Sequence, residues 1–218
     1  MRQFVLLFLL VPVLSFAQDS VDPEAKVILD KISTELNSNE KVQLMFDLTI
    51  KFPGADESIK EGKLVQDGDK FTVDVGAQTI LCNGVDLYMI NKEMKSAQLS
   101  AASSMEDSQG MMNPKQMLTM YDSGDYYYAI TGEEDYKGKR VLNIEFKPKD
   151  RYAEFFKMRM AVDKETNKPI YIKLFNKDGS QFILELKSLI FPKSIDNSQF
   201  EFSTDAFPGI SVEDLRID

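Results

Sequence analysis

Carboxylates are the most numerous side chains in this 218-residue chain that could act as acid–base catalysts. They gather at Glu133, Glu134 and Asp135, and again at Asp67 and Asp69. A hydrolase that uses two acids needs both carboxyl groups to face each other across a cleft. Each cluster here lies between two apolar, strand-like segments, where a turn normally leaves acidic side chains in water. We therefore expect neither a catalytic pair nor a metal site.

Other catalytic chemistry is limited by composition. The chain has no histidine and a single cysteine, Cys82. Ser–His and Cys–His dyads, His-liganded zinc and an intramolecular disulfide are therefore excluded. Sequence motifs of serine hydrolases, phosphate-binding loops and zinc proteases are also missing from the chain. The composition predicts a binding protein that is not an enzyme and has no cofactor.

Methionine is the side chain concentrated in one place. Five of the eleven methionines lie in SMEDSQGMMNPKQMLTMYDSG, residues 104–124. Asn113 and Pro114 mark a helix start, and the next two turns place Met117, Leu118 and Met120 on one apolar arc. Methionine adapts to several packings and is common on promiscuous apolar surfaces. We expect a movable lid over an apolar cavity, and the alternative is that these methionines fill an irregular core.

The elements that would carry such a cavity follow from hydrophobic periodicity. Asp22 is a good N-cap and Pro23 suits a first helical position, so an amphipathic helix is predicted from Pro23 to about Leu36. From Lys41 onward the period changes to two, which is typical of strands with one apolar face. Asn83 and Gly84 between two apolar runs predict a tight hairpin.

About ten or eleven such strand segments follow one another, joined by short turns. This pattern predicts a mainly β protein of the α+β type. We expect an incomplete antiparallel β-barrel, a half-barrel meander, in which the amino-terminal helix and the short lid helix cover an apolar cavity. Alternation alone does not determine which face of each strand is concave.

Two stretches then suggest a family. The carboxyl end reads QFEFSTDAFPGISVEDLR, from Gln199 to Arg216, with a Phe-x-Phe strand, a proline turn, a glycine and an acidic pair. The segment from Gly62 to Asn91 reads GKLVQDGDKFTVDVGAQTILCNGVDLYMIN, with a Gly-x-Leu strand and an Asn-Gly hairpin. In this order the two stretches resemble the periplasmic outer-membrane lipoprotein carriers of the LolA family.

One position departs from the family pattern. In the well-known carriers, an arginine in the turn after the Gly-x-Leu strand ties the lid shut, and a proline follows it. The matching position here is Asp67, followed by Gly68. The resemblance therefore does not explain how a lid would be held closed in this chain, nor does it identify the cargo.

The amino terminus predicts export. Residues 1–17 combine Arg2, an apolar run and a small-residue site ending at Ala17, as in a cleaved signal peptide. We expect residues 18–218 to form a single carrier domain that is soluble in the periplasm. Without Arg2, 25 basic residues stand against 35 acidic ones. This balance disfavours nucleic acid and anionic membranes as partners, but it leaves room for a locally basic patch.

The resemblance implies a carrier that holds the acyl chains of lipoproteins and ferries them from the inner to the outer membrane. Its partners would be the acylated lipoprotein or another lipid cargo, an inner-membrane release complex and an outer-membrane acceptor, and a monomer is expected. The alternative is a lipid-sensing or envelope-stress-sensing module on the same fold. The residues that we expect to line the cavity are Ile32, Leu36, Leu44, Phe46, Leu48, Ile50, Phe71, Val73, Leu87, Met89, Met117, Leu118, Met120, Met158 and Leu184.

Overall fold

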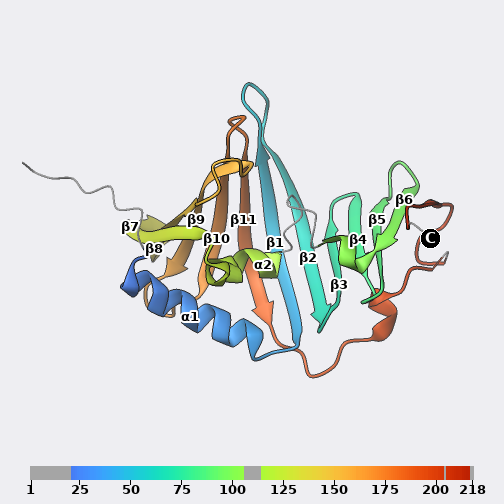
Figure 1. Cartoon of the computed structure of the whole chain (residues 1–218), viewed down its shortest axis with the longest axis horizontal. Helices are drawn as coiled ribbons and strands as arrows, with labels where there is room; N and C mark the ends of the chain where they lie inside the picture. The colour runs from blue at the N-terminus through green and yellow to red at the C-terminus, as the bar shows by residue number, and fades with distance from the viewer. Residues whose placement is uncertain (1–20, 106–113, 204, 217–218) are drawn as a thin grey trace, which may run out of the picture.

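The structure is a computed structural model that describes residues 21–105, 114–203 and 205–216. The predicted signal peptide lies outside these residues, as do Met111 and Met112 of the methionine stretch. Figure 1 shows one curved sheet with two helices on the same side of it.

The first helix, α1 (Pro23–Asn37), begins where the sequence predicts. The Asp22 carboxylate accepts hydrogen bonds from the backbone N–H of Glu24 at 2.8 Å and of Ala25 at 3.3 Å. These bonds satisfy two of the amide groups that every helix start leaves unpaired. The apolar side of the helix faces the sheet and is buried.

Twelve strands make up the sheet in the described part of the chain. The first six are β1 (Lys41–Lys51), β2 (Ser58–Asp67), β3 (Lys70–Val75), β4 (Gln78–Cys82), β5 (Asp86–Asn91) and β6 (Ser96–Ala101). The others are β7 (Tyr126–Tyr136), β8 (Lys139–Pro148), β9 (Phe155–Asp163), β10 (Pro169–Asn176), β11 (Gln181–Ile190) and β12 (Ser211–Asp214). Between β6 and β7 lie η1 (Ala102–Met105), α2 (Pro114–Thr119) and η2 (Met120–Ser123), and η3 (Asn197–Phe200) precedes β12.

The strand order is β12-β6-β5-β4-β3-β2-β1-β11-β10-β9-β8-β7. The expected mainly β fold, an open sheet with a helix and a lid helix, is confirmed. Two details differ from the expectation of one continuous antiparallel meander. β1 pairs with β11, so two meanders are joined at the centre of the sheet. β12, a short and exposed strand that alternation does not reveal, adds a parallel pair with β6.

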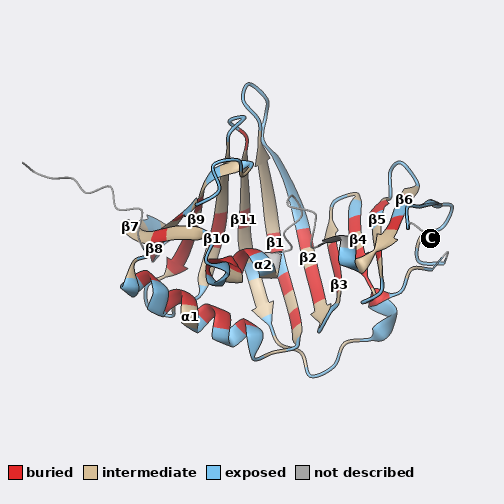
Figure 2. Cartoon of the chain, in the orientation of Figure 1, coloured by how far each residue is buried: buried red, intermediate tan, exposed pale blue. Residues whose placement is uncertain are grey.

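This topology explains the position of the lid helix. Because β6 and β7 lie toward opposite ends of the sheet, the chain between them must cross from one side of the molecule to the other. The crossing carries α2 over the same face that α1 covers (Figure 1). Buried positions alternate along the strands and line the side of α1 that faces them, as Figure 2 shows.

The carboxyl-terminal motif covers the opposite, outer face of β3 to β5. The Thr72 hydroxyl donates to the carbonyl oxygen of Gln199 at 2.6 Å. Phe200 is 1% exposed, and the ring of Phe202 stacks on that of Tyr88 with 4.7 Å between centroids. The Phe-x-Phe pair therefore holds the end of the chain against the sheet.

Candidate functional site

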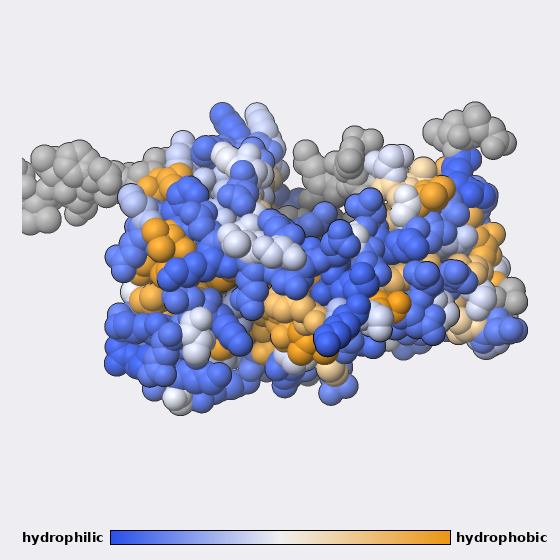
Figure 3. Space-filling view, turned by 90° about the horizontal axis from the view of Figure 1, so that it is seen from below, coloured by the Kyte–Doolittle hydropathy of each residue, from blue (hydrophilic) through white to orange (hydrophobic). Residues whose placement is uncertain are grey.

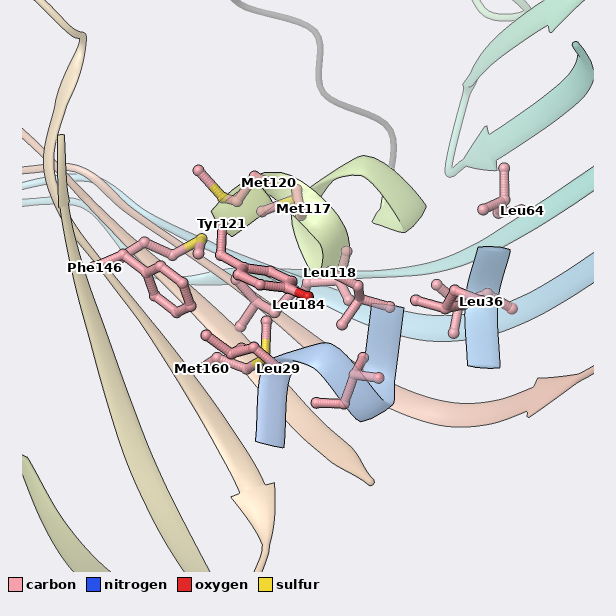
Figure 4. Close-up of a cluster of buried hydrophobic side chains, with 14 of the residues drawn as sticks. Leu29, Leu36, Leu64, Met117, Leu118, Met120, Tyr121, Phe146, Met160 and Leu184 are labelled. Carbon is pink, nitrogen blue, oxygen red and sulfur yellow. The ribbon is translucent and has the colours of Figure 1, made fainter. Parts of the chain in front are cut away.

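One apolar cluster occupies the concave face beneath α1 and α2. Met117, Leu118 and Met120 of the lid point toward the sheet, and Leu29 of α1 meets them from below (Figure 4). Leu118 is 1% exposed and Leu29 is fully buried. The cluster continues onto the sheet through Phe146 of β8, Met160 of β9 and Leu184 of β11.

Most of the residues expected to line a cavity belong to this cluster. The members are Ile32, Leu36, Leu44, Phe46, Phe71, Val73, Leu87, Met117, Leu118, Met120, Met158 and Leu184. Leu48 packs against the cluster and Ile50 is half-buried, whereas Met89, within β5, is 39% exposed. The strand face that the sequence analysis selected is thus the concave face for the clustered strand residues.

Several residues of the cluster were not predicted. Leu29 shares the helical face of Ile32 and Leu36, and Met160 follows Met158 by two residues, so periodicity contained a signal for both. Phe146 follows Ile144 by two residues and Tyr128 follows Tyr126 by two, so alternation marked their faces as well, but not that α1 and η2 would cover β7. Tyr128 is 5% exposed, and its ring lies 5.9 Å from that of Tyr121, edge to face.

Apolar side chains of α1 and of the lid lie on the concave face of the sheet. They contact the sheet directly in a single cluster. A guest molecule would have to replace contacts that the lid now makes. Methionine is suited to such an exchange, since its unbranched thioether loses little when the packing changes.

Polar contacts hold the lid to α1. The Tyr121 hydroxyl donates to the Asp30 carboxylate at 2.9 Å, and the Ser33 hydroxyl donates to the Asp122 carboxylate at 3.2 Å. Burial and the bond to Asp30 raise the pKa of Tyr121. The Lys26 ammonium, 2.7 Å away, and the Tyr121 hydroxyl hold the pKa of Asp30 below its usual range.

Asp67 takes no part in these contacts. Its carboxylate lies 3.3 Å from the Lys41 ammonium, directly opposite on β1. Tyr121, Asp122, Asp30 and Ser33 instead supply the connection between lid and helix. Sequence reasoning missed this connection, because the hydrogen-bonded pairs are 89 and 91 residues apart.

A pocket of about 700 Å³ lies near the end of the sheet that carries β12. Its lining includes Met89 and Ile80, together with the amide side chains of Gln78, Asn91 and Gln98. Ile80 also packs against the central cluster, so the pocket adjoins the concave core. Seen from the end where α1 lies, the surface is mainly hydrophilic, with apolar residues gathered in a few areas (Figure 3).

The expectation that both acidic clusters lie in turns is wrong for Glu133, Glu134 and Asp135, because β7 runs on to Tyr136 and includes them. Glu133 pairs with Arg140 at 2.6 Å and with Lys164 at 2.5 Å, and these cations lower its pKa. Glu134 accepts a hydrogen bond from the Tyr171 hydroxyl at 2.7 Å, which with burial raises the pKa of Tyr171 to about 12. In the part of the chain that the structure describes, no three acidic or cysteine side chains gather as metal ligands.

No helix within the described ranges combines the length and apolar character needed to cross a bilayer. Among protein families, a model described as "-like: Uncharacterized protein" matches residues 82–199, more than half of the chain. None of the curated proteins matches the chain.

Several solved structures are similar in fold. An uncharacterized conserved protein from Thermus thermophilus has a TM-score of 0.55 at 10% identity, covering 88% of this chain and 99% of its own. A LolA superfamily protein from Nitrosomonas europaea has a TM-score of 0.41 at 14% identity, covering 82% and 97%. The MucA/MucB complex of Pseudomonas aeruginosa has a TM-score of 0.37 at 16% identity, covering 84% and 62%. At these identities the likenesses concern the fold, and LolA superfamily proteins are among the structural neighbours.

Proposed function

The chain belongs to the family described as "-like: Uncharacterized protein", and we propose that it is a periplasmic carrier that holds acyl chains against its concave face. The observation that carries this proposal is the lid. Residues of a six-residue helix and of the 3-10 turn after it close an apolar face on which two helices and many strands meet. The sequence resemblance to lipoprotein carriers supports the same function.

Binding and release of an acyl chain require only the burial of apolar surface and the exchange of apolar contacts. Each methylene of an acyl chain that leaves water contributes about 0.8 kcal/mol. An acyl chain that slides between Leu118 and the sheet would replace side-chain contacts with similar apolar ones. Release to an acceptor then needs only a site that binds the chain more tightly, with no covalent step. The cargo we propose is an acylated lipoprotein received from an inner-membrane release complex and delivered to an outer-membrane acceptor.

A tethered lid tests whether acyl chains enter beneath it. Cysteines introduced at Ser33 and Asp122, whose side-chain oxygens are 3.2 Å apart, would join α1 to the lid when oxidised. We expect the oxidised protein to lose binding of a fluorescent acyl probe and the reduced protein to regain it. Equal probe binding in both redox states would contradict entry beneath the lid.

Substitutions on neighbouring residues give a second test. Phe46 is 2% exposed on the concave face, whereas Met45 is 46% exposed and points to the outer face. Asp in place of Phe46 should weaken probe binding, and Asp in place of Met45 should leave it unchanged. Circular dichroism of both variants separates lost binding from lost folding.

The alternative function is a lipid-sensing or envelope-stress-sensing module. The ion pair between Asp67 and Lys41 favours it, because the position that latches the lid in the well-known carriers serves another purpose here. A carrier should transfer acyl chains to acceptor vesicles within minutes. A sensor should retain them and form a stable complex with one protein partner, which pull-down from envelope extracts would detect.

A further inference from the structure

The pocket of about 700 Å³ is built by strands, without the two helices. It spans four neighbouring strands, β4, β5, β6 and β12, and includes Met94 of the β5–β6 turn. Its described lining contains no residue of α1 or α2. Binding sites for small molecules usually have volumes of about 300–1,000 Å³. The pocket is therefore large enough for the part of a ligand that extends beyond the lid.

Strand pairing places the pocket on the concave face. Ile80 of β4 lies opposite Met89 of β5, which lies opposite Gln98 of β6. Gln98 in turn lies opposite Glu213 of β12. Residues that are directly opposite on neighbouring strands point to the same side of a sheet. Ile80 also packs against the central cluster, so the whole row lies on the face that the lid covers elsewhere.

An apolar path joins the buried cluster to this pocket. Val73 of β3, a member of the cluster that is 7% exposed, lies opposite Ile80. The half-buried Ile80 is followed across the sheet by Met89, which is 39% exposed. Exposure thus rises step by step from the core to the pocket. A molecule whose acyl chain lies in the core would bring its polar end to the pocket along this row.

Uncharged polar side chains surround the apolar residues of the pocket. They are the amides of Gln78, Asn91 and Gln98 and the hydroxyls of Ser96 and Ser211. The exposed amides of Gln78 and Gln98 bond no other group in the described part of the chain. Each free amide offers two donor hydrogens and an acceptor oxygen. The pocket therefore suits a ligand that carries both hydrogen-bond donors and acceptors.

Glu213 is the only charged side chain in the described lining, and no lysine or arginine of the described residues pairs with it. Lys60, Lys92 and Lys95 are neighbours of the pocket in the sheet or in the chain, and all three lie outside its lining. Lys92 already forms an ion pair, and Glu93 stands in the same turn. Proteins normally bind phosphate with lysine or arginine. A phosphate in this pocket would meet a carboxylate instead.

We propose that this pocket binds the uncharged, hydrogen-bonding head of an acylated ligand whose chain lies on the concave face. The inference rests on the proposed carrier function and adds the class of head group that the site selects. Glycerol hydroxyls and esters, or the amides of a lipidated peptide, match the amides and hydroxyls of the lining. A phosphate would place its charge beside Glu213 without a cation to offset it. The ligand is therefore a neutral acyl compound in preference to an anionic phospholipid.

Competition between two lipids with the same acyl chain tests this selectivity. Monooleoylglycerol, and the same molecule carrying a phosphate, would each displace a fluorescent acyl probe from the chain of residues 18–218. We expect the neutral lipid to displace the probe at about one-tenth the concentration, because juxtaposed like charges disfavour binding. An oleoylated dipeptide amide, as a third competitor, distinguishes a pocket for glycerol from a pocket for peptide amides. Equal competition by the neutral lipid and its phosphate would overturn the proposal.

A positive charge placed in the pocket should remove the selectivity. Gln98→Lys puts an ammonium beside Glu213, so the phosphate-bearing lipid should then compete as well as the neutral one. Gln43→Lys is the matched control, because Gln43 lies on the outer face of β1, next to the buried Leu44. It should keep the parent's preference for the neutral lipid. Circular dichroism verifies that both variants are folded. A preference that Gln98→Lys leaves unchanged would show that head groups do not enter the pocket.

A single tryptophan reports whether the pocket itself is occupied. The chain has no tryptophan. Met94 is 75% exposed at the pocket, and Val85 is 73% exposed in the turn at the other end of β5. Monooleoylglycerol should shift the emission of the Met94→Trp variant to shorter wavelength and leave that of Val85→Trp unchanged.

The same emission response in both tryptophan variants, or none in either, would overturn the proposal even if the acyl probe binds. A shift in Met94→Trp alone, in a chain that binds no acyl probe, would contradict the carrier function and leave the pocket as a site for neutral head groups. Thermal melts of both variants verify that neither tryptophan disturbs the fold.

Discussion

The ring of Phe46 on β1 lies directly over the α-carbon of Gly62 on β2. The two residues are opposite each other in the antiparallel pair, and a Cβ atom at Gly62 would overlap the ring. A side chain at position 62 is therefore excluded by the ring of Phe46. Backbone conformation does not explain the glycine, because its φ is not in the left-handed region. Phe46 is 2% exposed, so it has little room to move aside.

Gly62→Ala should accordingly destabilise the protein by about 1–3 kcal/mol, the usual cost of overpacking a core. In a Phe46→Leu background the smaller side chain leaves room, so the same substitution should cost less. Urea unfolding of the four proteins in this cycle measures the difference. Lys63→Ala, on the outer face, is the control. An equal loss of stability in both backgrounds would mean that the Phe46 ring is not what excludes a side chain at position 62.

Tyr121→Phe should weaken the attachment of the lid to α1 without removing apolar contacts from the core. The change removes one hydroxyl that donates to the Asp30 carboxylate. Hydrogen bonds to charged groups contribute about 1.5–3 kcal/mol, less where water reaches the carboxylate. We expect faster hydrogen exchange in residues 117–123 and faster uptake of an acyl probe. Tyr127→Phe is the control, because the Tyr127 hydroxyl has no hydrogen-bond partner among the described residues. Unchanged exchange would show that the hydroxyl does not hold the lid.

Asp22 should contribute to the acid sensitivity of the fold. Its carboxylate accepts from the backbone N–H of Ile130 at 3.0 Å and from the start of α1, and these bonds lower its pKa. The stabilisation is fully present above the ordinary carboxyl pKa of about 3.9 and is lost as pH falls through the lowered value.

The measurement is the free energy of unfolding between about pH 2 and pH 5. Asp22→Asn should flatten this pH dependence, since the amide keeps an acceptor oxygen but cannot titrate. The exposed Asp56 supplies a matched variant, Asp56→Asn, which should follow the parent curve. A parent-like slope for Asp22→Asn would show that Asp22 stays equally charged in both states.

Asp67→Arg should not create the arginine latch of the well-known lipoprotein carriers. Lys41 lies directly opposite at 3.3 Å, so the new arginine would face a like charge. Opposed like charges in a sheet cost about 0.2–1 kcal/mol. We expect a small loss of stability in urea unfolding and an unchanged rate of acyl-probe uptake. Slower uptake would mean that this position can still reach the lid.

Local patterns in the sequence were sufficient to predict the elements. Asp22 and Pro23 placed the start of α1, and Asn83 with Gly84 placed the β4–β5 hairpin, where the Asn83 side chain accepts from the N–H groups of Val85 and Asp86. Alternation from Leu44 onward identified the buried face of β1. These features depend on residues within a few positions of one another, so they are visible in any short window.

Only the tertiary structure decided which elements meet. The pairing of β1 with β11, the parallel addition of β12 and the bond from Tyr121 to Asp30 join residues far apart in the chain. The presence of Phe146 and Tyr128 in the core follows from the contacts that α1 and the 3-10 turn η2 make with β7, where the ring of Tyr121 meets that of Tyr128 and the Tyr128 ring meets that of Phe146. Periodicity fixes the face that a strand buries, whereas the neighbour that covers this face depends on long-range packing of the whole chain.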